Sequence, residues 1–426
     1  MSSGHRDGIG FNIRRFSGGT KDVSPANIKR PRPDCCRILM QLGNNARKNA
    51  FKHFNKFRGK DFVVDLLRST LRGSAPAPIP AALFANVEGG LPSFEVETRT
   101  IDEIYQLALK EGGTVTVWHG GDEKTQQDFL KTAFEARFPG MTLNITVDLS
   151  KYHDVNLDRQ LATGSVYVDS IILQTLNDFP RWKDEDALLL YKPLGYESIY
   201  EEFKDDDGAY MGLFIIAWSE TWNSNYVNTS SAPKEYTDFL KPQFKDKLVL
   251  TYPNDDDAVL YQFDLILRKY GYSWFKALLA QNPRWVRGTA TPANLLLTSN
   301  GTYTATFTSS TGLRPSSPLN SSFPTDGTFV SWPQTGAILK DAPHPESAKL
   351  LHSWILSLER QNGGGWSTRR DAPAPAGYPG ILEMNGTDPT KFSKWMMDRA
   401  AVERLRFFFE DKIGSAQGLS PLIDDL

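Results

Sequence analysis

From Gly112 onward, short apolar stretches alternate between a strand-like and a helix-like period. Residues 114–118 read Thr-Val-Thr-Val-Trp, a β-branched and aromatic run that is typical of a strand. The glycine turn of Gly120 and Gly121 interrupts this run. Apolar residues then recur at helical spacing from Phe129 to Phe138. The pattern therefore predicts a strand that breaks directly into a helix.

The same alternation continues along the chain and predicts an α/β fold with largely parallel sheets. A lead-in helix is expected where Ile101, Ile104 and Tyr105 share one side. Further strands are expected at 141–147, 167–173, 212–218, 246–252, 302–309 and 327–333, and further helices around 157–161, at 257–270, near 345–359 and at 391–410.

The amino-terminal part differs from the rest in charge. Residues 1–75 hold 16 Lys and Arg against 5 Asp and Glu, although the whole chain has a formal net charge of -2. We interpret 1–75 as a loosely ordered basic leader, 76–111 as a Pro/Ala-rich linker with the lead-in helix, and 413–426 as a tail. Without interleaved aromatic residues, the leader is not expected to bind nucleic acid.

Several classes of chemistry lack their usual residues. The two cysteines, Cys35 and Cys36, lie in the leader, so a thiol nucleophile, a disulfide or a thiolate metal site is excluded after residue 36. His119, His153, His344 and His352 show no metal-ligand spacing. No G-x-S-x-G elbow, P-loop or dinucleotide fingerprint follows a strand. We therefore expect no metal, no cofactor and no catalytic residue. No window approaches the roughly 18 apolar residues of a membrane span.

Candidate binding residues lie where predicted strands end, because ligands of open α/β sheets sit beyond the carboxyl ends of the strands. The first group is His119, Gly120, Gly121 and Asp122, where missing side chains would let a solute approach the backbone. A tight turn with Asp122 as a helix cap explains the same pattern.

The second group, Asn254, Asp255, Asp256 and Asp257, opens another helix. Capping would explain two of these residues, whereas a cluster facing a cleft would favour a cation, an amine or sugar hydroxyls. The third group combines strand-end aromatic residues with amides and hydroxyls, for which core packing or capping is the alternative: Gln174, Trp218, Ser219, Thr289, Thr291, Phe307, Thr308 and Trp332.

Five N-x-[ST] sequons are candidate N-glycosylation sites: Asn144, Asn228, Asn300, Asn320 and Asn385.

The order and spacing of residues 114–145 ("TVTVWHGGDEK…"), 159–173, 186–195, 233–271 and 336–359 resemble the type 2 periplasmic-binding-protein fold. Within it, the chain is similar to the extracellular solute-binding proteins grouped with ferric-iron ABC importers. The resemblance implies a Venus-flytrap of two lobes, each a mixed sheet flanked by helices, joined by two crossing strands near 214–219 and 303–309. Lobe 1 would comprise 112–215 and 310–412, and lobe 2 would comprise 216–309.

The resemblance also implies that a small-molecule solute is captured by hinge closure. Iron-binding members use adjacent tyrosines where this chain has Tyr303 alone, so ferric iron is not expected. Relatives that bind phosphate favour Ser, Gly or Thr where this chain has Asp255 to Asp257, so a polar or cationic solute is expected.

The sequons and the linker suit a secreted fungal glycoprotein, monomeric and without a membrane transporter as partner. Residues 1–75 would then reflect an alternative start of the chain. If residues 1–75 are instead a genuine leader, a cytoplasmic protein is expected. Two other functions stay open. One is an enzyme on this scaffold, with His119 or an aspartate of 255–257 as general base. The other is an adaptor that docks through its basic leader.

Overall fold

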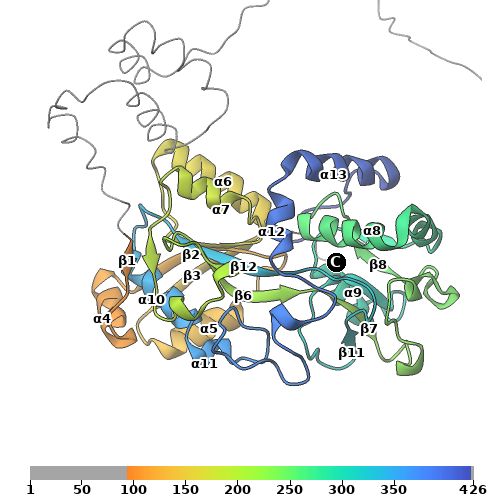
Figure 1. Ribbon diagram of the computed structural model, residues 1–426, viewed down its shortest axis with the longest axis horizontal. Coiled ribbons are helices and arrows are strands. Elements are labelled where there is room, and N and C mark those ends of the chain that lie inside the picture. The colour runs from red at the N-terminus through yellow and green to blue at the C-terminus, as the bar shows by residue number, and fades with distance from the viewer. Residues whose placement is uncertain (1–93, 424–426) are drawn as a thin grey trace, which may run out of the picture. The chain divides into compact units, whose positions relative to one another are not determined.

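The computed structural model describes residues 94–423, which lie in one compact unit, Gly90–Leu426. The predicted leader and most of the linker lie outside the described residues. The described part is a mixed α/β structure of two lobes, each built on its own sheet (Figure 1). The predicted fold class is confirmed.

Lobe 1 is built on a five-stranded sheet with the order β3-β2-β4-β12-β6. The first three strands are parallel, and β12 runs antiparallel to both β4 and β6. A short parallel pair, β1 with β5, lies apart from this sheet. The strands are β1 (Glu95–Val96), β2 (Thr114–Gly120), β3 (Thr142–Asp148), β4 (Ser170–Leu173), β5 (Tyr191–Lys192), β6 (Met211–Ala217) and β12 (Ser331–Ile338).

Helices cover both faces of this sheet (Figure 1). On one face Phe134 and Leu351 pack with strand residues such as Val117, and on the other Leu157 and Trp182 pack with Ile171. The helices of the first face are α4 (Ile101–Glu111), α5 (Asp128–Arg137) and α10 (Pro345–Ile355), followed by the short α11 (Leu358–Gln361); those of the second are α6 (Ser150–Thr163) and α7 (Asp178–Asp184).

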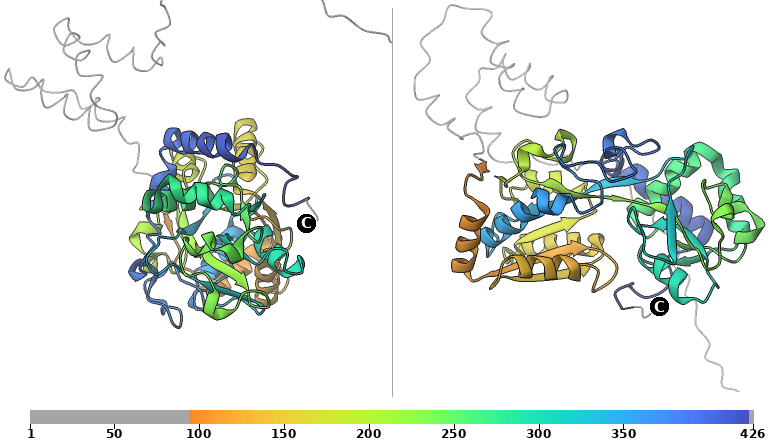
Figure 2. Two further views of the ribbon diagram at one scale, coloured as in Figure 1. Left: turned by 90° about the vertical axis from the view of Figure 1, so that its right-hand side faces the viewer. Right: turned by 90° about the horizontal axis from the view of Figure 1, so that it is seen from below.

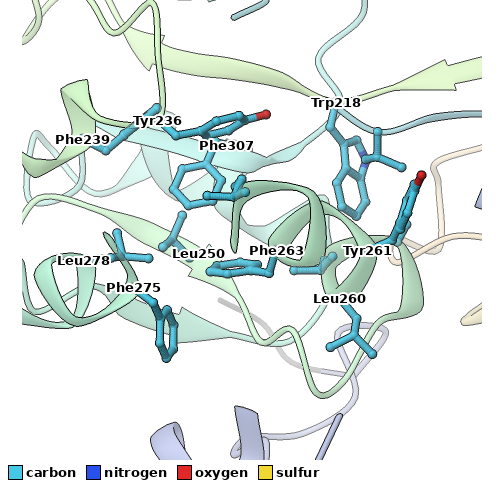
Figure 3. Close-up of a cluster of buried hydrophobic side chains, with 14 of the residues drawn as sticks. Trp218, Tyr236, Phe239, Leu250, Leu260, Tyr261, Phe263, Phe275, Leu278 and Phe307 are labelled. Carbon is cyan, nitrogen blue, oxygen red and sulfur yellow. The ribbon is translucent and has the colours of Figure 1, made fainter. Parts of the chain in front are cut away.

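Lobe 2 contains a three-stranded sheet, β10-β7-β11, and a parallel pair, β8 with β9. A single bridge between Leu248 and Ala305 connects the two sheets. Its core is aromatic, with Phe263 packed against Phe307 at a ring distance of 5.7 Å (Figure 3). The elements are β7 (Ser219–Asn223), β8 (Val249–Thr251), β9 (Arg284–Val286), β10 (Ala305–Ser309), β11 (Leu319–Ser322), α8 (Asp257–Ala280) and α9 (Thr291–Thr298). Gly271 interrupts α8 with φ 73°, where the predicted helix 257–270 ended.

The last two helices also belong to the core of lobe 2. In α12 (Lys391–Met396) and α13 (Arg399–Ile413), Phe392 and Phe409 are buried in the same cluster as Phe263 of α8. The sequence had placed all of 310–412 in lobe 1, but α12 and α13 pack in lobe 2. Strand β11 also belongs to lobe 2, because it pairs with β7. The physical reason is the apolar surface of α8, which these helices cover and the strands of lobe 2 do not.

The chain passes between the lobes at Trp218, where β6 leads directly into β7. Figure 2 shows the extended segments that join the two lobes. The second expected crossing, 303–309, is instead β10 of lobe 2, whose end pairs with Ser219. The return strand is β12, which begins at Ser331 opposite Ala217. Strand β12 therefore begins later than the strand predicted for residues 327–333. Pro333 is tolerated there because this part of β12 pairs with β6 but not with β4.

Candidate functional site

A cavity of about 200 Å³ is lined by residues of both lobes. Ten of the sixteen predicted ligand-binding residues line it, although they come from separate strand ends. They are Gly120, Gly121, Asp122, Gln174, Trp218, Asp255, Asp256, Asp257, Thr289 and Trp332.

The lobe 1 wall is the turn after β2 together with the amino terminus of α6. The two glycines are required there by close packing. A Cβ on Gly120 would lie 2.1 Å from the Ser150 hydroxyl, and one on Gly121 would lie 2.7 Å from Val147 Cγ1. Ser150 Oγ accepts a hydrogen bond of 3.0 Å from the backbone N–H of Gln174. The turn, the start of α6 and the end of β4 are therefore held as one surface.

Two tryptophans lie at the hinge side of the cavity. Trp218, between β6 and β7, and Trp332, in β12, meet edge to face with ring centroids 5.6 Å apart. The Trp332 Nε1–H donates to Gln334 Oε1 at 2.9 Å, which orients a second cavity-lining side chain. Because both tryptophans sit on the segments that connect the lobes, their fluorescence should report lobe movement.

The lobe 2 wall carries the acidic group, and its first carboxylate is paired. Asp255 accepts hydrogen bonds from Lys151 Nζ (2.7 Å) and Arg287 Nε (2.9 Å). Burial opposes ionisation of Asp255, but the Arg287 hydrogen bond and the Lys151 charge outweigh it and lower its pKa. Asp255 is therefore an ion-paired carboxylate.

The other two acids are occupied as well. Asp256 caps α8 by accepting from the backbone N–H groups of Ala258 (2.8 Å) and Val259 (2.9 Å), and burial raises its pKa to about 7. Asp257 binds Arg399 at 2.9 Å and also Arg406, both from α13. The acidic run that the sequence suggested as a source of free negative charge is thus neutralised within the protein.

Polar contacts join the two lobes around the cavity. Asp122 Oδ2 of lobe 1 accepts from Thr289 Oγ1 (2.7 Å) and from the backbone N–H groups of Thr289 and Ala290 in lobe 2. Lys151 reaches Asp255 across the same gap, and Arg287 Nη2 donates to the Tyr152 hydroxyl at 2.9 Å. The structure is therefore a closed arrangement of the lobes.

Six predicted site residues do not line the cavity. Phe307 lies in the lobe 2 core, and Thr308 Oγ1 of β10 donates to Thr251 Oγ1 of β8. Asn254 donates to the Gly414 carbonyl, away from the cavity. His119, Ser219 and Thr291 are also buried outside it. In each case the alternative of packing or local hydrogen bonding applies. For the strand residues His119, Phe307 and Thr308, the reason is that neighbouring residues of a strand face opposite sides of a sheet.

His119 illustrates this correction. Its side chain is 2% exposed, stacks on Phe214, and its Nδ1–H donates to the Gly120 carbonyl at 2.7 Å. Burial lowers its pKa to about 4. A neutral histidine sealed behind the turn cannot serve as a base for a molecule in the cavity.

Burial of histidines predicts acid sensitivity of lobe 1. Burial also lowers the pKa of His153 and of His352 to about 4. An unfolded histidine titrates near 6.5, so the unfolded state binds more protons as pH falls from about 6.5 to 4, and folding loses stability there. The substitution His352→Gln should remove the loss of stability that one buried histidine causes at acidic pH, because glutamine does not titrate. The free energy of unfolding of the variant minus that of wild type should be about 2 kcal/mol higher at pH 4.5 than at pH 7. Urea titration at the two pH values measures this difference. An identical difference at both pH values would contradict the burial argument.

Several cavity residues were not predicted. Ser150, Lys151, Thr175 and Asn177 lie within four residues of the ends of β3 and β4, so the rule that found Gly120 could have found them. Arg399 and Arg406 carried no such signal, because they come from the carboxyl-terminal helix. The remaining unpredicted lining residues are Gln126, Leu149, Asp154, Ile216, Gly288, Ala290, Ser310 and Gln334.

Two further properties concern metals and membranes. Within residues 94–423, no three His, Cys, Asp or Glu side chains are grouped so that they could hold a metal ion. In the same part of the chain, no helix has both the length and the apolar composition to cross a bilayer.

Comparison with known proteins agrees with this geometry. Residues 182–367 match the family described as bacterial extracellular solute-binding protein. The fold is that of the two-lobed periplasmic binding proteins. No curated protein sequence matches the chain.

Solved structures with the solute-binding fold cover most of this chain at low identity. The periplasmic binding protein AfuA from Actinobacillus pleuropneumoniae, with exogenous fructose-6-phosphate bound, is 16% identical with a TM-score of 0.56, covering 71% of this chain and 99% of AfuA. The ABC-transporter substrate-binding protein from Agrobacterium tumefaciens is 12% identical with a TM-score of 0.58, covering 71% and 96%. The ferric binding protein from Campylobacter jejuni is 17% identical with a TM-score of 0.51, covering 69% and 99%.

Proposed function

We propose that this protein captures a small polar solute between its lobes and releases it when they open. The observation that carries the proposal is the inter-lobe cavity, whose polar lining comes from both lobes and whose rim is joined by Asp122 and Asp255. A cavity of about 200 Å³ suits a small molecule rather than a peptide.

Capture by closure follows from the placement of these groups. A solute that contacts both lobes stabilises the closed state relative to the open state, and its affinity measures that difference. The contacts of Asp122 with Thr289 and Ala290 join the lobes directly and add to the stability of the closed state. The movement is possible because most of each hydrophobic core lies within one lobe, and because the chain crosses between the lobes in extended segments at Trp218 and at the start of β12.

Two features support binding over catalysis. His119, the general base of the enzyme alternative, is buried outside the cavity. The aspartates of 255–257 are held by Lys151, Arg287, Arg399, Arg406 and the amino terminus of α8. We therefore propose a non-enzymatic role.

We further propose that the protein is a secreted, monomeric fungal glycoprotein that works without a membrane importer. Support comes from the matched family, which is extracellular, and from the sequons. All five asparagines, Asn144, Asn228, Asn300, Asn320 and Asn385, are exposed, as attachment of a glycan requires. A fall in mass after endoglycosidase treatment of protein secreted by a eukaryotic host would support this assignment, and an unchanged mass would refute it.

Thermal unfolding of the full-length protein with a library of small solutes tests the proposed function. A solute present at about 100 times its Kd adds roughly 2.7 kcal/mol to the free energy of unfolding, which raises the Tm of a chain of this size by about 4 °C. Small-angle scattering should then show a smaller radius of gyration with that solute. If sugars, sugar phosphates, amines, amino acids and ferric citrate all leave both the Tm and the scattering unchanged, solute capture is refuted.

A further inference from the structure

The hydrogen-bonding groups that line the cavity divide into two kinds. The charged side chains are already engaged by protein partners, whereas several neutral amides and hydroxyls are not. Within residues 94–423, the side-chain amides of Gln174 and Asn177 make no hydrogen bond, and Thr175 Oγ1 is buried without a partner in a residue that is 7% exposed. These three residues lie together between the end of β4 and the start of α7.

The engaged charges leave little net field for an ionic solute. Asp122 accepts three hydrogen bonds, and Asp255 to Asp257 are capped or paired as described above. The cationic side chains of the cavity are engaged in these same ion pairs. Lys151 is bound to Asp255, and Arg399 and Arg406 are bound to Asp257. An anion in the cavity would have to compete with the ion pairs of Lys151, Arg399 and Arg406. A cation would have to compete with those pairs or with the hydrogen bonds that Asp122 and Asp256 already accept.

The remaining acidic residue that lines the cavity, Asp154, is also influenced by a neighbouring protein group. Asp154 of α6 faces Asp178 of α7, and burial together with the second carboxylate raises the pKa of Asp154. Asp178 is in turn paired with Arg181 at 3.0 Å. The raised pKa of Asp154 reduces the negative charge that this residue adds to the cavity.

We propose that the solute is an uncharged polyhydroxylated molecule, a sugar or a polyol. Hydroxyl groups both donate and accept hydrogen bonds, so they match the free amides of Gln174 and Asn177 and the hydroxyl of Thr175. Trp218 and Trp332 also border the cavity, but each is only 2% exposed, so the neutral polar groups and not the rings carry this assignment. This inference rests on the proposed function and deepens it.

Isothermal titration calorimetry of the full-length protein tests the class of solute. The neutral probes are pentoses, hexoses, hexitols, myo-inositol and disaccharides, and the charged probes are fructose 6-phosphate, putrescine and ferric citrate. A neutral probe should bind with a Kd that changes less than about twofold between roughly 20 mM and 500 mM NaCl, because salt screens charge interactions only. Binding of a charged probe with no binding of any neutral one overturns the inference but leaves solute capture intact. If no probe of either kind binds or alters the tryptophan fluorescence, the proposed function fails as well.

Variants locate the binding groups. Gln174→Ala combined with Asn177→Ala should weaken neutral-probe binding about 30-fold, since each lost hydrogen bond contributes roughly 1 kcal/mol and leaves a hydroxyl unpaired. The matched control is Gln106→Ala on α4, which is exposed and far from the cavity lining. The single variants replace the double one if its Tm falls by more than a few degrees. Equal Kd values for the cavity and control variants would overturn the assignment of these residues.

Discussion

Asp122→Ala should shift the protein toward the open state and weaken solute binding by about 30-fold. One carboxylate oxygen of Asp122 accepts from Thr289 Oγ1 and from two backbone N–H groups of lobe 2. Hydrogen bonds to a charged group contribute about 1.5–3 kcal/mol each in favourable cases, and these exist only when the lobes are closed. A net loss of about 2 kcal/mol from closure corresponds to roughly 30-fold in affinity.

The shift is measurable without any solute. Small-angle scattering of the Asp122→Ala protein should give a larger radius of gyration than wild type, and the fluorescence of Trp218 and Trp332 should change with it. Asp128→Ala is the matched control, because Asp128 is exposed in the first turn of α5 and does not line the cavity. If the Asp122 variant scatters like wild type and binds solute with wild-type affinity, then these contacts do not determine closure.

The sequence predicted the path of the chain through the sheets better than it predicted the site. Strand ends were visible because β-branched runs stop at glycine or at an acidic turn, as they do at Gly120 and at Asp255. Those ends border the cavity in the structure. By contrast, the direction of each side chain was not accessible, since a shift of one residue moves it to the other face. His119 and Thr308 were placed on the wrong face for that reason.

The charge of the site was also beyond sequence reasoning. Three consecutive aspartates suggested an acidic cleft, but their partners lie far away in the chain, at Lys151, Arg287, Arg399 and Arg406. A local pattern cannot reveal a neutralising partner that is brought in by tertiary folding. The sharper conclusion, that the free groups are neutral, depends on knowing which charges are already paired.

Phe409→Ala should lower the free energy of unfolding by about 3–5 kcal/mol, whereas Phe407→Ala on the same helix should change it by less than about 0.5 kcal/mol. Phe409 is 0% exposed and packs edge to face on Phe263 (5.4 Å) and Phe275 (5.2 Å) of α8, while Phe407 is 63% exposed. The cavity left by Phe409 would lie against Phe263 and Phe275, which Figure 3 shows in the lobe 2 core.

This pair of variants tests whether α13 is part of lobe 2. Urea unfolding gives the two free energies, and native-state hydrogen exchange should show that Phe409→Ala loses protection in α8 before it does so in the lobe 1 sheet. The order matters for function, because Arg399 and Arg406 of α13 hold Asp257 at the cavity wall. Because α13 both packs in the lobe 2 core and supplies the cations that neutralise Asp257, loss of its packing should also disturb the charge balance of the cavity. Equal destabilisation by the two variants, or loss of protection in lobe 1 first, would contradict this arrangement.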